Sequence, residues 1–231
     1  MNLSKRSYSK ELLDNDDIPF DDIRQNMKEL NVINTWLGGH AITLAGLKRL
    51  LGARKTVTIC EIGCGGGDNL HAISKYCRQN KIAVNCIGID IKRDCIEYAK
   101  EQWRHPVTVT WIASDYQAVE FERKPDIIFS SLFCHHFTEA QLAKQLQWMK
   151  ANSTIGFFVN DLQRHVLAYH AIKILTRLFS SSYLVKNDAP LSVARGFTKN
   201  EWQQVVKSAE TGPCQVQWKW AFRYLLIYRH G

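Results

Sequence analysis

A glycine-rich turn between two patterned segments constrains the fold of this chain more than any other feature. Residues 61–68 read Glu-Ile-Gly-Cys-Gly-Gly-Gly-Asp. The apolar run from Val57 to Ile62 precedes the turn and is typical of a buried strand. Residues 68–78 follow it, with Leu70, Ile73 and Cys77 at helical spacing. A strand, a glycine turn and a helix in this order let a ligand approach the backbone closely.

The rest of the chain continues the alternation. After the turn we expect strands at 83–89, 107–112, 126–131 and 154–160, and helices at 93–103 and 138–150. Residues 17–51 predict one or two helices. Behind the last strand the pattern predicts a helix over 162–179, a loop over 180–196, a helix from Thr198 to Ser208 and two antiparallel strands within 215–228. Short β-rich runs separated by helices indicate a parallel sheet covered by helices on both faces.

These patterns predict one α/β domain with a Rossmann-like, doubly wound sheet. We divide it into a helical cap (1–54), a ligand-binding core (55–161), an insertion on the substrate side (162–197) and a closing helix and hairpin (198–231). No run of eighteen apolar residues predicts a spanning helix. Seven cysteines without a CxxC pair favour free thiols in a reducing cytoplasm over disulfides or a zinc knuckle. We expect a cytoplasmic protein and no metal site.

The residues around the glycine turn indicate which ligand it holds. A dinucleotide fingerprint would place a third glycine where this chain has Asp68. Glu61 and Asp68 flank the turn, and two carboxylates would repel a pyrophosphate. They would attract a ligand that carries an ammonium and a sulfonium, as S-adenosylmethionine (SAM) does. A turn that only packs a helix on a strand is the alternative.

Further acids end the next two strands. Asp90 follows Gly67 at close to the spacing of about 20 residues at which an acid meets ribose hydroxyls. Asp115 ends the following strand and could accept from an adenine amino group, with Tyr116 or Ile91 packed on the ring. Each aspartate could instead be a turn or helix-capping residue.

Taken together, these motifs resemble those of class I SAM-dependent methyltransferases. The resemblance rests on four ordered stretches: Glu61-x-Gly63-x-Gly65-x-Gly67, Gly88-x-Asp90, Ser114-Asp115 and Asp126-Ile127-Ile128-Phe129-Ser130. It implies a seven-stranded sheet with a reversed last strand. It also implies cofactor contacts from Glu61, Gly63, Cys64, Gly65, Gly67, Asp90, Ile91, Ser114, Asp115, Tyr116 and Ser130. The stretches 34–40 and 188–197 look like a bacterial subgroup labelled as quinone- or polyketide-type small-molecule methyltransferases.

Histidines mark the expected reaction centre. His135 and His136 follow the strand that ends at Ser131, at the ligand-binding edge of the sheet. Either could act as general base for an oxygen acceptor, with His136 preferred, or could only shape the pocket. Asp161 and His165 lie one helical turn apart and could form an acid–base pair; a helix cap beside a surface histidine is the alternative.

The insertion is expected to recognise the acceptor. Its first helix has a broad apolar face and could cover an apolar or aromatic molecule, pack on the domain or rest on a membrane surface. We predict substrate contacts from Arg164, Tyr169 and Arg195, and from His40 in the cap.

The formal charge of +8 leaves the substrate class open. Basic residues are scattered, which makes a nucleic-acid partner unlikely and favours O- or C-methylation of a small molecule. Methylation of RNA or protein, or non-catalytic SAM binding, are the alternatives. The sequence leaves the oligomeric state open.

Overall fold

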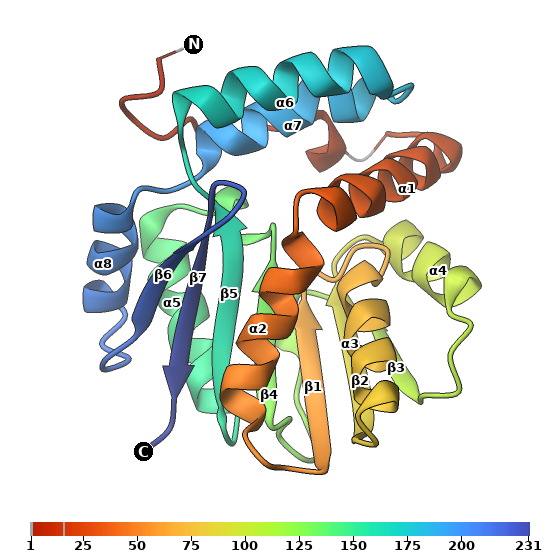
Figure 1. Ribbon diagram of the computed structural model, residues 1–231, viewed down its shortest axis with the longest axis vertical. Helices are drawn as coiled ribbons and strands as arrows, with labels where there is room; N and C mark the ends of the chain where they lie inside the picture. Colours follow the sequence, from red (N-terminus) through yellow and green to blue (C-terminus); the bar gives the residue numbers. More distant parts are fainter. Residues whose placement is uncertain (1, 16) are drawn as a thin grey trace.

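The computed structural model describes residues 2–15 and 17–231, and it contains one seven-stranded sheet in the order β3-β2-β1-β4-β5-β7-β6. The strands are β1 (Thr56–Ile62), β2 (Ala83–Asp90), β3 (Val109–Ala113), β4 (Ile127–Ser131), β5 (Gly156–Leu162), β6 (Gln215–Lys219) and β7 (Arg223–Arg229). Strands β1 to β5 pair in parallel, whereas β7 runs antiparallel between β5 and β6. The predicted Rossmann-like class and the reversed last strand are therefore confirmed (Figure 1).

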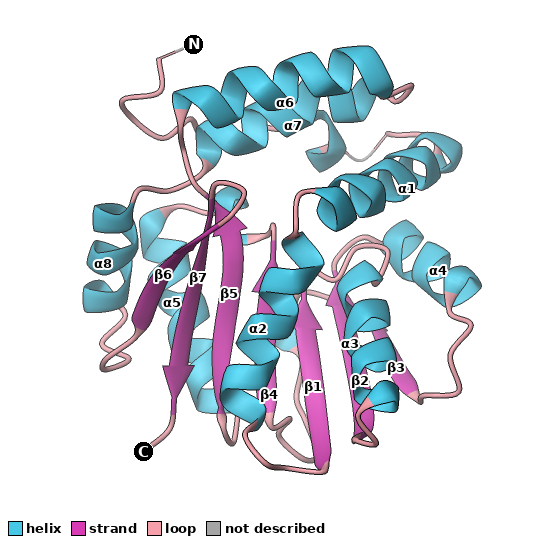
Figure 2. Cartoon of the chain, in the orientation of Figure 1, coloured by secondary structure: helices cyan, strands magenta, loops and turns pink. Residues whose placement is uncertain are grey.

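Helices cover both faces of the sheet and one of its edges. They are α1 (Phe20–Trp36), α2 (Gly39–Leu51), α3 (Asp68–Gln79), α4 (Arg93–Gln102), α5 (Glu139–Asn152), α6 (Val166–Phe179), α7 (Tyr183–Arg195) and α8 (Lys199–Ser208), with short 3₁₀ turns η1 (Leu12–Asp14), η2 (Tyr116–Ala118) and η3 (Cys134–His136). Helices α2 and α3 lie on one face, and α5 and α8 lie on the other (Figure 2). Helices α1, α6 and α7 extend over the carboxyl ends of the parallel strands (Figure 1).

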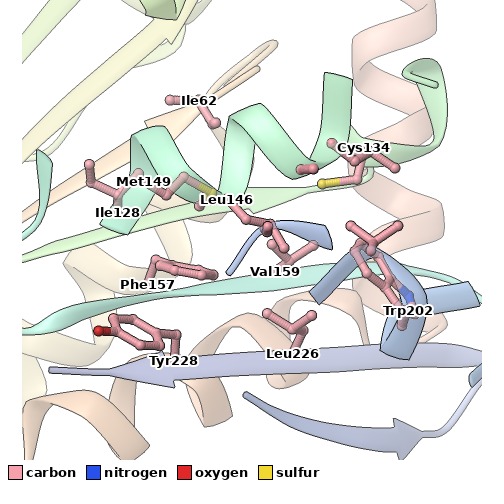
Figure 3. Packing of buried hydrophobic residues seen from close by; sticks show 14 of the residues in the cluster. Ile62, Ile128, Cys134, Leu146, Met149, Phe157, Val159, Trp202, Leu226 and Tyr228 are labelled. Atoms are coloured by element: carbon pink, nitrogen blue, oxygen red, sulfur yellow. The ribbon is translucent and has the colours of Figure 1, made fainter. Parts of the chain in front are cut away.

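The sheet is held between two apolar layers. On the α5 and α8 side, Leu146, Met149 and Trp202 pack against Val159 and Leu226 of the central strands (Figure 3). Each of these side chains is fully buried, and such burial stabilises by about 1.5–3 kcal/mol per side chain. The seven cysteines are all free, and only Cys214 is not buried. This packing fixes the sheet, so the loops at its carboxyl edge start from rigid positions.

The main difference from the expected elements lies in residues 180–196, which form the helix α7 rather than a loop. Pro190 lies inside this helix, and three serines at 180–182 precede the helix, so the local sequence favours a loop. The helix forms because Ser182 caps its start by accepting a hydrogen bond from the Val185 N–H and because Leu184 and Val185 are buried. Packing against the neighbouring α6 therefore outweighs the proline.

Other boundaries shift by a few residues. The helix expected from Leu162 begins at Val166, because β5 continues through Leu162. The cap assigned to residues 1–54 includes Met1 and Asp16, which lie outside the described residues. Within the two described ranges, no helix combines the length and apolar character that a membrane span requires.

Candidate functional site

A cavity of about 1190 Å³ lies between the carboxyl ends of the strands and the helices α1, α6 and α7. At one end it is lined by the glycine turn and by acids that follow β1 and β2. At the other end it is lined by apolar side chains of the three helices, among them Leu30, Ile33, Ile172, Leu175 and Val185. The cavity therefore has a polar end and an apolar end, and it lies at the ligand-binding edge of the sheet.

The glycine turn is shaped by backbone conformations that other residues rarely adopt. Gly63, Gly65 and Gly67 have φ angles of +65°, +49° and +74°, in the left-handed region. A Cβ atom on Gly63 would lie 2.2 Å from the Phe133 ring. The Cys64 N–H donates to the carbonyl of Ile89, which ties the turn to the end of β2. Of the predicted cofactor residues here, Gly63, Cys64 and Gly65 line the cavity, whereas Gly67 lies behind it.

Asp90 joins the first two strand ends. Its carboxylate accepts hydrogen bonds from the N–H groups of Gly65 and Lys92 at 2.8 and 2.9 Å. Burial raises the pKa of Asp90, although these two bonds oppose the shift. The next residue, Ile91, lines the cavity and is 72% exposed, which is unusual for a large apolar side chain. An acid beside an uncovered apolar surface can receive a ribose and a flat ring.

Glu61 is a buried acid with one unused oxygen. Its Oε1 accepts from the Asn69 amide at 3.0 Å, and its Oε2 has no partner among the described residues. Burial raises the pKa of Glu61 well above its usual range, and the neighbouring charges of Asp68 and Asp90 raise it further. A bound cation would relieve this unfavourable state.

Arg223, at the start of β7, is a buried basic residue with donors that are unpaired within residues 2–15 and 17–231. Its side chain is fully buried and lines the cavity, and Nη2 donates to Asn34 Oδ1 at 2.9 Å. Nε and Nη1 have no partner within the described part of the chain. Burial lowers the pKa of Arg223 to about 10. Unused donors on a buried arginine mark a place for an anionic group.

His40 lies behind the cavity wall rather than in it. Its Nε2 bonds Asp68 Oδ2 at 2.7 Å, and Asn34 donates to the same oxygen at 2.9 Å. Burial alone would raise the pKa of Asp68, but these partners outweigh it and lower the pKa. The histidine predicted to contact substrate thus holds Asp68, which does line the cavity.

His135 and His136 form a cluster with Glu11 of the N-terminal arm. The Nε2 of His135 lies 3.5 Å from Glu11 Oε1, and the Nε2 of His136 lies 3.8 Å from Glu11 Oε2. Both histidines line the cavity. Burial would lower the pKa of His135, but Asp161 and Glu11 raise it to about 9. Two carboxylates thus favour the protonated form of His135, which makes it a poor general base and leaves His136 as the candidate.

The predicted pairing of Asp161 with His165 is wrong. Because β5 continues through Leu162, the two residues do not lie on one helix, and Asp161 faces the end of β4. Its Oδ1 accepts from His135 Nδ1 at 2.8 Å, and its Oδ2 accepts from the N–H of Cys134 at 2.7 Å. His165 instead caps α6 and stacks on Phe222.

The residues predicted to contact substrate separate into two groups. Arg195 lines the cavity and is an ion-pair partner of Asp14 at 3.3 Å. Arg164 is buried outside the cavity wall, where Nη2 lies 2.7 Å from Glu201 Oε1. Tyr169 packs in the small core between α6 and α7. The structure therefore brings only Arg195 of these three to the cavity, because Arg164 is needed to join β5 to α8.

Besides Gly67, four predicted cofactor residues lie outside the cavity wall. Ser130 is buried and bonds the Cys134 thiol, and Tyr116 packs against Trp148 in the core. Asp115 is exposed and accepts from the Gln117 N–H at 2.9 Å. Ser114, beside it, bonds the Asp115 carbonyl. The structure thus gives Tyr116 a core position, while Asp115 caps the 3₁₀ turn η2.

Sequence patterns did not identify Glu11, Asn34 or Arg223. Of these three residues, only Arg223 is marked by its sequence context, since it is a charged residue directly before the apolar run from Tyr224 to Tyr228. Glu11 lies in a polar arm with no periodicity, and its role depends on where that arm docks.

The comparisons with known proteins agree with this geometry. Residues 59–152 match a family model described as a methyltransferase domain. No curated protein matches the chain by sequence. The plantazolicin methyltransferase BpumL in complex with SAH has a similar structure, with a TM-score of 0.64 and 15% identity over 91% of this chain and 89% of that one.

Two further solved structures are similar. Human N-acetylserotonin methyltransferase in complex with SAM has a TM-score of 0.65 at 14% identity, covering 92% of this chain and 57% of that one. The magnesium protoporphyrin IX methyltransferase of Synechocystis PCC 6803 with bound SAH has a TM-score of 0.55 at 13% identity, covering 84% of each chain. The matched domain and the fold together indicate an enzyme of the SAM-dependent methyltransferase class, with SAM as its cofactor.

Proposed function

We propose that this chain transfers the methyl group of SAM to an oxygen or carbon atom of a small, apolar or aromatic molecule. The observation that carries the proposal is the two-part cavity, whose acidic end fits a cationic cofactor and whose other end is lined by apolar helices. Its volume of about 1190 Å³ exceeds the ~300–1,000 Å³ usual for one small ligand, which suits a cofactor and an acceptor together.

The unused polar atoms fit the amino-acid part of SAM. Glu61 Oε2 is an acceptor without a donor, and Arg223 Nε and Nη1 are donors without an acceptor. A series of hydrogen bonds runs from Glu61 through Asn69, Thr43 and Asn160 to the Gly39 carbonyl. The Arg223 guanidinium lies close to Gly39, 3.1 Å from the position of a Cβ there. We infer that the ammonium of SAM faces Glu61 and that its carboxylate faces Arg223.

The nucleoside part would follow the strand ends. Asp90 retains lone pairs for ribose hydroxyls, since each carboxylate oxygen accepts a single backbone bond. Ile91 would then cover one face of the adenine and lose its solvent exposure. Asp115 remains the proposed acceptor for the adenine amino group.

The acceptor would lie under α1, α6 and α7. Apolar side chains of these helices line the cavity there, and Phe133, Phe137 and Phe222 add aromatic surface to the cavity wall. This lining favours an apolar or aromatic acceptor over RNA, whose phosphates would require a cluster of cations. The three solved structures above are named as methyltransferases of plantazolicin, N-acetylserotonin and magnesium protoporphyrin IX, none of them a nucleic acid, which agrees with this proposal.

Transfer of the methyl group requires alignment more than acid–base chemistry. SAM supplies a methyl group on a positively charged sulfur, and positioning alone can contribute about 7–11 kcal/mol. His136 faces the cavity and is the side chain that we place against the acceptor. His135 and Asp161 hold the η3 turn that presents it.

Two measurements test this function. SAM and SAH should raise the melting temperature, because a ligand that binds only the folded state stabilises it. Asp90→Asn should abolish most of that shift, whereas Glu210→Gln, at the far end of α8, should leave it intact. Labelled SAM with a panel of phenols, quinols and acyl-aromatics should yield labelled product. A melting shift with NAD but none with SAM or SAH would overturn the proposal.

A further inference from the structure

The cluster of Glu11, His135 and His136 has the composition of a metal site. One nitrogen from each histidine and one oxygen from Glu11 lie within 4.8 Å of one another. Glu11 and His135 are almost fully buried, and the His136 side chain is 23% exposed towards the cavity. The cluster joins two distant parts of the chain, the N-terminal arm and the η3 turn after β4.

The distances within the cluster suit a shared ion better than direct hydrogen bonds. Glu11 lies 3.5 Å from His135 Nε2 and 3.8 Å from His136 Nε2, whereas strong N–H···O bonds measure about 2.7–3.2 Å. Metal–nitrogen distances of about 2.0–2.1 Å separate the ligands of a tetrahedral site by about 3.4 Å. The ligand atoms, which lie within 4.8 Å of one another, would move closer together on binding to reach that geometry.

Both imidazole rings are already oriented for coordination. The Nδ1 of His135 bonds Asp161 at 2.8 Å, and the Nδ1 of His136 lies 3.2 Å from Asp14 Oδ1. Each ring thus turns one nitrogen to a carboxylate and its Nε2 to Glu11. Histidines that bind a metal almost always donate their other N–H to a carboxylate or carbonyl, which fixes the tautomer and strengthens the ligand.

Acidic and basic groups both surround the cluster. Three carboxylates lie around the two imidazoles: Glu11, Asp14 and Asp161. The Arg195 guanidinium lies 3.3 Å from Asp14 and 3.8 Å from Glu11, and the Arg6 guanidinium donates to the His135 carbonyl at 3.3 Å. A divalent ion would take the place of the proton that His135 holds between Asp161 and Glu11, because an imidazole nitrogen binds a metal only after it loses its proton.

We propose that Glu11, His135 and His136 bind one divalent transition-metal ion, with Zn²⁺ as the probe of choice. This inference rests on the proposed function and deepens it: the ion held by His136, rather than His136 as a base, would activate the acceptor. Two histidines and one carboxylate form the ligand set of several zinc and iron enzymes and leave coordination positions open. Here the open side faces the cavity, because Glu11 and His136 both line it.

The ion would act on an acceptor that carries a hydroxyl or enol group. The acceptor oxygen would bind the open position and lose its proton to water, since coordination lowers the pKa of the hydroxyl. That oxygen then forms a bond to the methyl carbon as the carbon–sulfur bond of SAM breaks. The bonding electron pair returns to sulfur, so neutral SAH and a methyl ether remain. Oxygen, rather than carbon, is therefore the methylated atom.

Metal binding can be measured without substrate. Purified protein is stripped with EDTA, exchanged into chelator-free buffer and titrated with Zn²⁺ by calorimetry, and Co²⁺ is added separately to record its d–d absorption. We expect one ion per chain and a Co²⁺ spectrum of a low-symmetry site. Glu11→Gln and His136→Gln should each weaken Zn²⁺ binding by more than 100-fold, since loss of an outer partner alone costs about 10–100-fold. His165→Gln, at the cap of α6, should bind Zn²⁺ as the native chain does.

SAH binding and metal binding are measured separately, so the metal site can fail while the methyltransferase proposal stands. Glu11→Gln should keep its affinity for SAH, because Glu11 does not contact the cofactor end of the cavity. SAH binding without stoichiometric Zn²⁺ or Co²⁺ binding would overturn the metal site and leave the methyltransferase proposal standing. Equal Zn²⁺ affinity in the native chain and in either ligand variant would also overturn it. If a variant fails to fold, the stoichiometry and the Co²⁺ spectrum of the native chain decide.

Discussion

Replacement of Gly63 by alanine tests the shape of the cofactor turn. At φ +65° an alanine pays about 1–2 kcal/mol for the left-handed conformation. Its Cβ would also lie 2.2 Å from the Phe133 ring. That ring cannot move freely, because it packs edge-on against Phe137 at a centroid distance of 4.8 Å. Overpacking of this kind costs about 1–3 kcal/mol, so Gly63→Ala should destabilise by about 2–5 kcal/mol in total.

Gly65 provides the matched control. It has a φ angle of +49°, but the nearest atom to its Cβ position is the Met27 sulfur at 3.4 Å. Gly65→Ala should therefore cost only the conformational part, about 1–2 kcal/mol. Urea unfolding followed by circular dichroism, without ligand, gives both free energies of unfolding.

A double-mutant cycle with Phe133 separates the two contributions. In a Phe133→Ala background the clash disappears, so Gly63→Ala should cost no more than Gly65→Ala does. If Gly63→Ala costs the same in both backgrounds, or no more than Gly65→Ala in the native chain, the close approach of Phe133 does not shape the turn and the reasoning fails.

Two further predictions concern buried charges. Glu61→Gln should stabilise the ligand-free protein and weaken SAH binding. The folded-state pKa of Glu61 is raised, so its ionisation costs stability once the pH exceeds the unfolded value of about 4.3. The stability gap between variant and native chain should widen from pH 5 to pH 8, and a constant gap in urea unfolding would contradict this. Arg164→Met should destabilise by about 3 kcal/mol, because it leaves Glu201 partly buried without its partner at 2.7 Å. A loss below about 1 kcal/mol in the same assay, as for an exposed pair, would show that this ion pair contributes little.

The order of the elements and the acidic end of the cavity could be predicted from the sequence. Strand and helix periods are local properties, and the glycine turn requires backbone conformations that few other residues adopt. Parallel strands bring their carboxyl ends to one edge, so the sequence predicts Glu61 and Asp90 near the turn. Both residues line the cavity.

Local rules failed where a residue's partner comes from another part of the chain. The pairing of Asp161 with His165 assumed a helix, yet β5 continues through Leu162 and turns Asp161 towards His135. The helix α7 was missed because Pro190 disfavours it locally, while burial against α6 stabilises it.

The apolar end of the cavity and the cluster of Glu11, His135 and His136 depend on tertiary structure alone. Glu11 approaches the histidines because the arm that carries it docks on α7, where Ser192 donates to Glu11 Oε1 at 2.8 Å. Arg223 reaches the cofactor end only because β7 inserts between β5 and β6. Neither placement leaves a periodic signal, since each depends on contacts between segments far apart in the chain, whereas propensity and spacing report only on neighbours along it.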